Sequence, residues 1–328
     1  MIGAPIRSEY WVNEMLIIKK HLVKQLEGEP KLIIAGGSSP LFGIDAEYLS
    51  QQLKMPVINF GLHAALPLEK ILKEVSKIAK TNDSIVLQLE PGYYNRIQKL
   101  DTWQIENVIA WDHSFWETMS YHEKKQFLTS IPLSTFGEMV MATVAKEIFP
   151  SIIRKRLNAL DAEYVISKFN NRPPPSSFEY SAYNLNNYGD MTKAEGSLYQ
   201  GIEGDIHNPS SLSDFTSKQL TAFVKEMKLK KIKVYFANAP YLVSEYNLDE
   251  LRASEALFSK DFEKIGFFID KREDLTFGRS FFFDTNLHLN TQGRSLRTEL
   301  LIISLRNKAP EITNYAEKKN YNLCNLPN

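Results

Sequence analysis

The sequence predicts an α/β fold with a central parallel sheet of about five strands between two layers of helices. The first observation is an alternation of short apolar runs with longer segments of helical periodicity over residues 31–92, which resumes after residue 216. The second is that these runs are apolar throughout, as expected of strands covered on both faces. With 328 residues, 43% of them hydrophobic, the chain can bury a core of this size.

The N-terminal part carries the clearest succession of elements. Between Glu9 and Leu26, apolar residues recur near helical spacing with lysines between them, which predicts an amphipathic helix on the outside of the sheet. The alternation follows directly, and its elements are strand Lys31–Ala35, helix Ala46–Leu53, strand Val57–Phe60, helix Leu68–Ala79 and strand Ser84–Leu89.

The alternation breaks from Gly92 to about Thr216, where aromatic-rich helical pieces precede a polar loop with three consecutive prolines, Pro173 to Pro175. This pattern predicts an insertion or a cap. In the last helix, Leu296, Leu300 and Ile303 stand at core spacing. The elements that resume are helix Ser217–Leu229, strand Lys233–Ala237, helix Asp249–Ile265, a short strand near Phe267–Ile269 and helix Gln292–Arg306.

The succession of predicted elements divides the chain into three parts. Residues 1–30 are expected to form an N-terminal amphipathic helix packed on the core. Residues 31–92 and 217–328 are expected to form the α/β core, and residues 93–216 the helical and loop insertion or cap.

Charge and cysteine content exclude several classes of function. Lysine and arginine number 39, as do aspartate and glutamate, so the formal net charge is zero and no nucleic-acid partner is expected. The single cysteine, Cys324, excludes an intrachain disulfide and a cysteine metal site. No cofactor and no metal are expected.

No segment reaches the roughly 20 apolar residues that cross a bilayer. Residues 1–10 also lack the basic start and apolar run of a secretory signal. We therefore expect a soluble chain without a membrane span. An anchor upstream of these residues is left open, as is the choice between the cytoplasm and a bacterial cell envelope.

Residues that could carry chemistry collect where the predicted strands end. Ligands of an open parallel sheet bind beyond the carboxyl ends of its strands. Gly36 and Gly37 can adopt backbone conformations that residues with a Cβ cannot. The turn that they form would project Ser38 from the strand end. The segments expected at this edge are 36–39, 61–63, 90–92, 238–240 and 284–288.

Two plainer interpretations of the Gly36–Ser39 segment stay open. Its serines could cap a helix at an ordinary strand-to-helix turn. Its backbone could instead hold a phosphate, although neither G-x-G-x-x-G nor G-K-[ST] is present. The nucleophile elbow of α/β-hydrolases is also not matched, because Pro40 stands where G-x-S-x-G requires its last glycine.

The motifs resemble those of the SGNH, or GDSL-like, hydrolase superfamily. Gly36-Gly37-Ser38 is similar to the family's first block and Asn59-Phe60-Gly61 to its glycine block, while Asp284 and His288 stand where the family has its acid and base. The closest likeness is to bacterial SGNH-like proteins associated with surface polysaccharide. It covers about residues 32–92 and 233–303, and it implies a three-layer sandwich with flavodoxin-like strand order.

The resemblance implies a role for each residue. Ser38 would attack an ester carbonyl, His288 would act as general base and then acid, and Asp284 would hold the imidazolium. The N–H groups of Ser38 and Gly61 would bind the oxyanion, with Asn238 as a replacement donor.

The sequence departs from the family in two places. Leu89-Glu90-Pro91-Gly92 stands where a Gly-x-Asn-Asp turn normally supplies an oxyanion donor, and three residues instead of two separate Asp284 from His288. His63, Glu90 and Tyr93 are candidates for substrate binding. His63 is otherwise a hydrogen-bonded turn residue, and the favoured interpretation of Glu90 is an ion pair with an arginine.

We therefore expect a serine esterase or O-acyltransferase that acts on O-acyl groups, most simply acetyl, of a surface glycan or its precursor. The partner would be an acylated carbohydrate or a small ester. The alternative is a non-catalytic SGNH-like module that binds polysaccharide or an assembly partner, and a third option is a nucleotide-binding protein. The oligomeric state and the acceptor, water or sugar, are left open.

Overall fold

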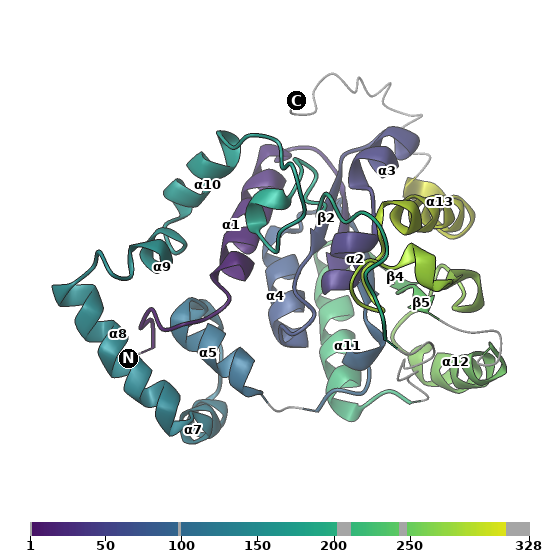
Figure 1. Ribbon diagram of the computed structural model, residues 1–328. Coiled ribbons are helices and arrows are strands. Elements are labelled where there is room, and N and C mark those ends of the chain that lie inside the picture. Colours follow the sequence, from purple (N-terminus) through teal and green to yellow (C-terminus); the bar gives the residue numbers. More distant parts are fainter. Residues whose placement is uncertain (1, 98–99, 202–210, 243–247, 313–328) are drawn as a thin grey trace.

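A parallel sheet of four strands lies at the centre of the computed structural model, which describes residues 2–97, 100–201, 211–242 and 248–312 (Figure 1). Cys324 lies outside these ranges. The strand order is β2-β1-β3-β4, and the strands are β1 (Leu32–Gly36), β2 (Val57–Gly61), β3 (Ser84–Leu89) and β4 (Lys233–Asn238). Beyond β4, the short strand expected at Phe267–Ile269 consists of a single parallel bridge between Phe268 and Phe236.

Helices cover both faces of this sheet, which confirms the predicted α/β class. Successive side chains of a strand point to opposite faces, so Ile33 and Ala35 belong to one buried cluster and Leu32 and Ile34 to another. The first cluster includes residues of α1 (Tyr10–Gln25), α4 (Leu68–Ile78), α11 (Asp214–Leu229) and α12 (Leu248–Phe262), and the second those of α3 (Ala46–Leu53) and α13 (Thr291–Lys308).

The free edge of β2 is closed by a lysine and by a loop of the insertion. Lys19 of α1 is fully buried and donates hydrogen bonds of 2.7 Å to the carbonyl oxygens of Asn59 and Gly189. The N–H of Asn59 donates to the Tyr188 carbonyl at 2.8 Å. Gly189 has a φ of +86°, and a Cβ there would lie 2.4 Å from the Asn59 oxygen, so a larger residue would open this contact.

The prediction that Leu296, Leu300 and Ile303 form the core face of α13 is wrong. Leu296 and Ile303 are 43% and 53% exposed. The helix instead buries a mixed face that includes Arg297 and Leu301. Arg297 donates from Nη2 to Asp270 Oδ2 at 2.9 Å, so a charge partner accompanies the buried guanidinium, although its Nε and Nη1 have no partner among the described residues.

The insertion forms a string of helices that extends to one side of the sheet (Figure 1). Two of its helices begin with capping boxes, Asp101 with Gln104 and Ser120 with Glu123. The helices are α5 (Thr102–Ala110), α6 (His113–Trp116), α7 (Tyr121–Ser130), α8 (Leu133–Ile148), α9 (Arg154–Asn158) and α10 (Ala162–Asn170), followed by the 3-10 turn η2 (Ala182–Asn184).

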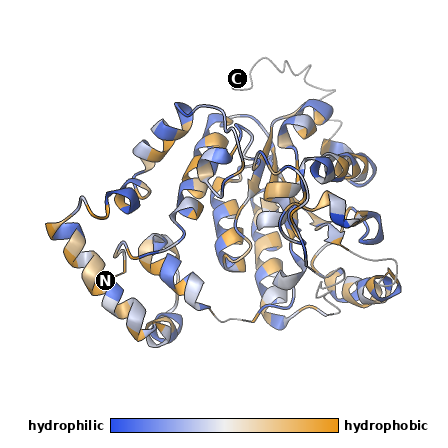
Figure 2. Cartoon of the chain, viewed as in Figure 1, coloured by the Kyte–Doolittle hydropathy of each residue, from blue (hydrophilic) through white to orange (hydrophobic). Residues whose placement is uncertain are grey.

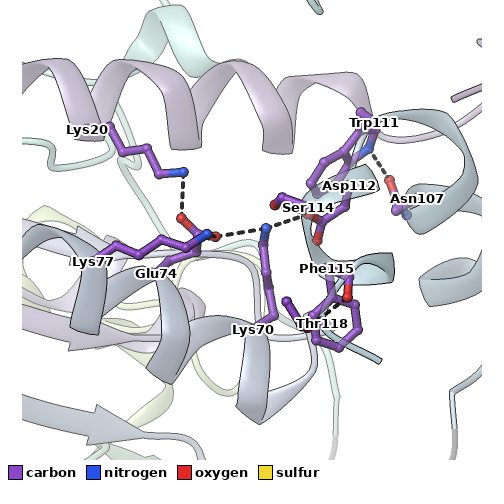
Figure 3. Close-up of polar contacts among 10 residues, drawn as sticks. All are labelled: Lys20, Lys70, Glu74, Lys77, Asn107, Trp111, Asp112, Ser114, Phe115 and Thr118. Atoms are coloured by element: carbon purple, nitrogen blue, oxygen red, sulfur yellow. Dashed lines mark hydrogen bonds and ion pairs between the residues drawn. The ribbon is translucent and has the colours of Figure 1, made fainter. Parts of the chain in front are cut away.

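A cluster of charged side chains around the buried Glu74 and Lys70 joins the insertion to the core (Figure 3). Glu74 of α4 pairs with Lys20 of α1 at 2.5 Å, with Lys70 at 3.1 Å and with Lys77 at 3.0 Å. Lys70 also pairs with Asp112 before α6 at 2.5 Å. Burial acts to raise the pKa of Glu74, but the lysines outweigh it and lower this pKa to about 2.

Short elements complete the description. A helix, α2 (Ser38–Gly43), stands where the sequence analysis expects a turn. A two-stranded sheet pairs β5 (Tyr241–Leu242) with β6 (Thr276–Phe277), and the remaining 3-10 turns are η1 (Pro91–Tyr93), η4 (Glu273–Leu275) and η5 (Arg279–Phe281). Within the described ranges, no single helix is long and apolar enough to cross a membrane.

Candidate active site

Ser38 is the first residue of α2, directly beyond the carboxyl end of β1. Two glycines allow this turn to lie against the end of β3. A Cβ on Gly36 would be 1.9 Å from the Gln88 carbonyl oxygen, and one on Gly37 would be 2.4 Å from a Glu90 carboxylate oxygen. The Gly-Gly pair is therefore required by close packing between two strand ends.

The Ser38 side chain is held in the fold, but its hydroxyl stays accessible. The residue is only 5% exposed. Its Oγ makes no hydrogen bond with another described residue. This oxygen is also not fully buried. The exposed part of Ser38 therefore includes the oxygen that a nucleophile needs.

His288, Asp284 and Tyr180 form a hydrogen-bonded group. His288 Nδ1 lies 2.8 Å from Asp284 Oδ1, and the Tyr180 hydroxyl donates to Asp284 Oδ2. Burial acts to raise the pKa of Asp284, but the hydrogen bonds from His288 and Tyr180 hold it below its usual range. An ionised Asp284 fixes the proton of His288 on Nδ1 and leaves Nε2 as the free acceptor.

The turn between Asp284 and His288 accommodates the extra residue. Thr285 Oγ1 accepts hydrogen bonds from the N–H groups of Leu287 at 3.2 Å and His288 at 3.1 Å. This compact turn returns the histidine to its carboxylate. The longer spacing therefore does not prevent the acid and the imidazole from meeting.

Phe42 joins the two halves of the site. It lies one helical turn after Ser38 on α2, and its ring stacks on that of His288 with a centroid distance of 4.0 Å and an angle of 9°. Arg294 of α13 donates from Nε to the Phe42 carbonyl at 2.8 Å. The histidine therefore lies against the helix that begins with the serine, although some 250 residues separate them in the sequence.

No hydrogen bond joins Ser38 Oγ to His288 among the described contacts. Such bonds are often long in ligand-free enzymes and tighten when substrate binds. His288 Nε2 also has no partner among the described residues, and it is not sealed from solvent. Neither Ser38 Oγ nor His288 Nε2 is therefore fully buried.

An aromatic rim links His288 to His63. The Tyr180 ring is 6.4 Å from His288 and 5.8 Å from Trp11, and Trp11 is 5.7 Å from His63. His63 in turn stacks on Trp103 at 4.8 Å. Residues of α1, of the insertion and of the β2 end thus form one continuous chain of ring contacts that reaches His288.

His63 has a defined protonation state in this rim. Burial, and after it the neighbouring His288, lower the pKa of His63 to about 4, so the ring is neutral at pH 7. Its Nδ1 accepts a hydrogen bond from the Ala65 N–H at 3.2 Å. The single ring proton therefore lies on Nε2, which can donate to a ligand.

The expected arginine partner of Glu90 is not observed, since no ion pair of Glu90 occurs among the described residues. Glu90 Oε1 instead accepts a hydrogen bond from the Ser39 N–H at 2.6 Å, and Oε2 is buried without a partner. Burial raises the pKa of Glu90, although the Ser39 N–H opposes this shift. The Glu90 carboxyl group thus already binds the Ser39 N–H, which a phosphate held by this segment would need.

Three further candidates have structural partners. The Gly61 N–H donates to Asn59 Oδ1 at 2.9 Å, and Asn238 Nδ2 donates to Asp270 Oδ1 at 3.1 Å. The Tyr93 hydroxyl is buried and donates to the Ala64 carbonyl at 2.7 Å. Each of these three groups is therefore already engaged by a partner within the fold.

Sequence reasoning missed two residues beside the candidate site, Phe42 and Trp11, and it missed the contact of Tyr180 with Asp284, although tyrosines of that polar loop suggest stacking on sugar rings. Phe42 was not identified because the sequence of α2 is typical of a turn. Trp11 was not identified because it fits the apolar stripe of an amphipathic helix. Tyr180 stands out only as a tyrosine in a polar loop, and nothing in its surroundings points to Asp284. No local pattern reports a contact across 104 residues.

The sequence matches no protein-family model, and no curated protein matches it significantly. The proposal below therefore depends on the geometry of the residues and on the resemblance of their motifs.

A groove of about 580 Å³ begins at the rim and is lined in part by Trp11, Tyr180 and Tyr183, together with Glu14 and Lys168. It offers aromatic faces next to charged hydrogen-bonding groups. The described residues contain no group of three or more histidine, cysteine, aspartate or glutamate side chains that could hold a metal.

Proposed function

We propose that this protein is a serine-dependent ester hydrolase or O-acyltransferase. The observation that carries the proposal is the position of His288, which is hydrogen-bonded to Asp284 at 2.8 Å and stacked on Phe42, one turn from Ser38. A serine needs a neighbouring imidazole to take its proton, and the imidazole needs an acid that fixes its tautomer. The three side chains supply these parts.

In the proposed reaction, Ser38 Oγ attacks the ester carbonyl carbon while His288 Nε2 takes its proton. The tetrahedral intermediate collapses, and the leaving alcohol receives that proton from the imidazolium, which leaves an acyl group on Ser38. Water or a sugar hydroxyl then attacks the acyl-enzyme, with Nε2 again as the base. Asp284 stabilises the imidazolium in both halves.

The oxyanion requires donors directed at the site of developing charge. The Ser38 N–H is one, as the first amide of α2. The Gly61 N–H and the Asn238 amide are already used by Asn59 and Asp270. His63 Nε2–H replaces them in our proposal, because His63 is neutral, lies near enough to His288 for that residue to lower its pKa, and carries its proton on Nε2.

The proposed substrates are O-acyl groups, most simply acetyl, on a surface glycan or its precursor. The motif resemblance motivates this choice. The groove beside Tyr180 supports it, since tyrosine and tryptophan rings stack on sugar faces and the adjacent charged groups can bond hydroxyls.

A non-catalytic binding module of the same fold is the second candidate. It is favoured by the engaged Gly61 and Asn238 donors, which leave the oxyanion site less complete than in an efficient hydrolase. In that case the aromatic rim and the groove would bind glycan without chemistry at Ser38.

The test is labelling by an active-site phosphonate together with turnover of p-nitrophenyl acetate. The native chain should form a covalent adduct on Ser38, located by peptide mass, and His288→Ala should abolish it. Ser39→Ala is the matched control, because Ser39 is the adjacent, fully buried serine and its substitution should leave the adduct in place. A folded native chain that forms no adduct and releases no nitrophenol would identify the binding module.

A further inference from the structure

Helix α8 presents an apolar face to solvent. Of its 16 residues, the structure buries only Thr135, Met139 and Ala142. The exposed apolar side chains are Leu133 at 85%, Phe136 at 43%, Val140 at 44%, Met141 at 69%, Val144 at 42% and Ile148 at 62%. These six side chains are called the α8 face below.

The α8 face is opposite to the side of the helix that packs on the protein. At about 100° per residue, its members fall within an arc of about 140°, and Thr135 and Ala142 lie on the other side. Phe149 and Ile152, 55% and 76% exposed, continue the apolar surface beyond the helix. Figure 2 shows hydrophobic residues along α8 at the margin of the molecule, far from the sheet. Soluble monomers rarely leave so many adjacent apolar side chains uncovered.

The sequence around this face has a local excess of basic residues, although the whole chain is neutral and the exposed Glu147 lies within the same arc of α8. Residues 121–160 contain six lysine and arginine residues against three glutamates. Arg154 and Lys155 are exposed and follow Ile152 almost directly, and Lys155 also lines the groove beside Tyr180. Arg156 is used within the fold, since it donates to the Pro5 carbonyl at 2.7 Å. A row of apolar side chains that ends in exposed basic ones matches the boundary between acyl chains and anionic headgroups.

The bend between α7 and α8 favours a position on the surface of a bilayer over one that crosses it. Together the two helices have the length and apolar composition of a membrane-crossing segment, but they are bent by 96° at their junction. Tyr121 and Leu128 of α7 are also exposed, at 86% and 53%. An L-shaped, one-sided apolar surface suits the membrane interface, where only one side of each helix meets lipid.

We propose that the α8 face docks this protein on an anionic lipid surface, with its apolar side chains at the acyl boundary and Arg154 and Lys155 against lipid phosphates. The proposal is independent of the proposed function, because vesicle binding needs no ester substrate and α8 contributes no residue to the groove beside Tyr180. Of the two basic residues, only Lys155 also lines that groove. A second copy of the chain could cover the same face, and the oligomeric state of the chain distinguishes these two occupants.

The test is sedimentation of the full chain with vesicles of phosphatidylcholine alone and of phosphatidylcholine mixed with phosphatidylglycerol. We expect binding to the anionic vesicles that weakens with added salt. The double substitution Met141→Glu, Ile148→Glu should lower the partition coefficient at least about tenfold, because it places charge at the acyl boundary. Leu229→Glu is the control, since Leu229 is 78% exposed on α11, away from this surface, and its substitution should change nothing.

The basic residues give a second measurement. Replacing Arg154 and Lys155 with glutamine should weaken binding to anionic vesicles about fivefold for each charge. Circular dichroism of each variant reports on folding. The proposal is overturned if the native chain does not sediment with anionic vesicles, or if the Leu229 control loses as much binding as the double variant. Light scattering that finds a dimer which the double glutamate variant dissociates would assign the face to a second copy.

Discussion

At the residue scale, the site consists of side chains whose protonation the fold has fixed in advance. Asp284 is kept ionised by the groups bonded to it, and His63 is kept neutral by burial. An ionised acid and a neutral donor at neutral pH are what acyl transfer requires. The two states arise from different causes, hydrogen bonding in one and desolvation in the other.

The role of His63 predicts a particular kinetic result. His63→Ala should lower kcat for p-nitrophenyl acetate about 100-fold to 1,000-fold, because one oxyanion donor is lost. KM should change little, since the bond forms mainly in the transition state. His63→Gln should recover part of kcat, because its amide can place a donor near the former Nε2. Equal losses in the alanine and glutamine variants would reduce His63 to a packing residue.

The residue scale also marks what the sequence could supply. Ser38, Asp284 and His288 stand out in the sequence as candidates because each follows a strand end or precedes a helix in a short motif. Which groups are free to bind an oxyanion is not visible there. Gly61 and Asn238 have suitable positions, but Asn59 and Asp270 occupy them in three dimensions, and no sequence pattern reports which hydrogen bonds are already made.

At the scale of elements, buried charge rather than apolar packing decides several contacts. The mixed face of α13 is held by Arg297 and its partner Asp270, and this is why apolar spacing pointed to the wrong side of that helix. The junction of α1, α4 and α6 is likewise built from lysines around Glu74. Hydrophobic periodicity does not detect a helix face that is buried by paired charges.

Glu74→Gln should therefore destabilise the fold. The substitution leaves the buried Lys70 with Asp112 as its remaining carboxylate and removes the counter-charge of the partly exposed Lys20 and Lys77. We expect a loss of about 1–3 kcal/mol in the free energy of unfolding measured in urea. Lys77→Gln is the control, because Lys77 is 43% exposed and should cost less than about 1 kcal/mol.

The same cluster predicts a dependence on pH. The pKa of Glu74 is lowered to about 2 in the folded protein, so its contribution is complete above the usual carboxyl value and is lost as the pH falls through the folded pKa. The native chain should lose stability between about pH 4.5 and pH 2 more steeply than Glu74→Gln. Parallel curves would show that Glu74 is not the titrating group.

At the scale of the whole molecule, the regular part of the fold was predictable and the insertion was not. Helix Ala46–Leu53 and strand Ser84–Leu89 have the predicted bounds, because two-sided burial makes each element visible as a separate apolar pattern. The insertion lacks that regularity. Its loop at Tyr188 and Gly189 nevertheless completes the sheet by covering β2, a contact that depends on hydrogen bonds to backbone and on one buried lysine.

That lysine gives a prediction for the molecule as a whole. Burial lowers the pKa of Lys19 to about 7, against the partial opposition of Asp190, whereas in the unfolded chain it returns to about 10.4. Between these values the unfolded chain binds a proton that the folded protein does not, so stability rises with pH across this interval. Below pH 7 both states are protonated, and the cost of the buried charge is complete.

Lys19→Met should remove this rise. The variant also loses the two bonds to the Asn59 and Gly189 carbonyls, so the slope of stability against pH, and not its absolute value, is the quantity to compare. Urea unfolding at intervals from pH 7 to about pH 10 should give a steeper increase for the native chain than for the variant. If both slopes agree, Lys19 titrates normally inside the fold, and the link between α1, β2 and the insertion is an ordinary charged contact.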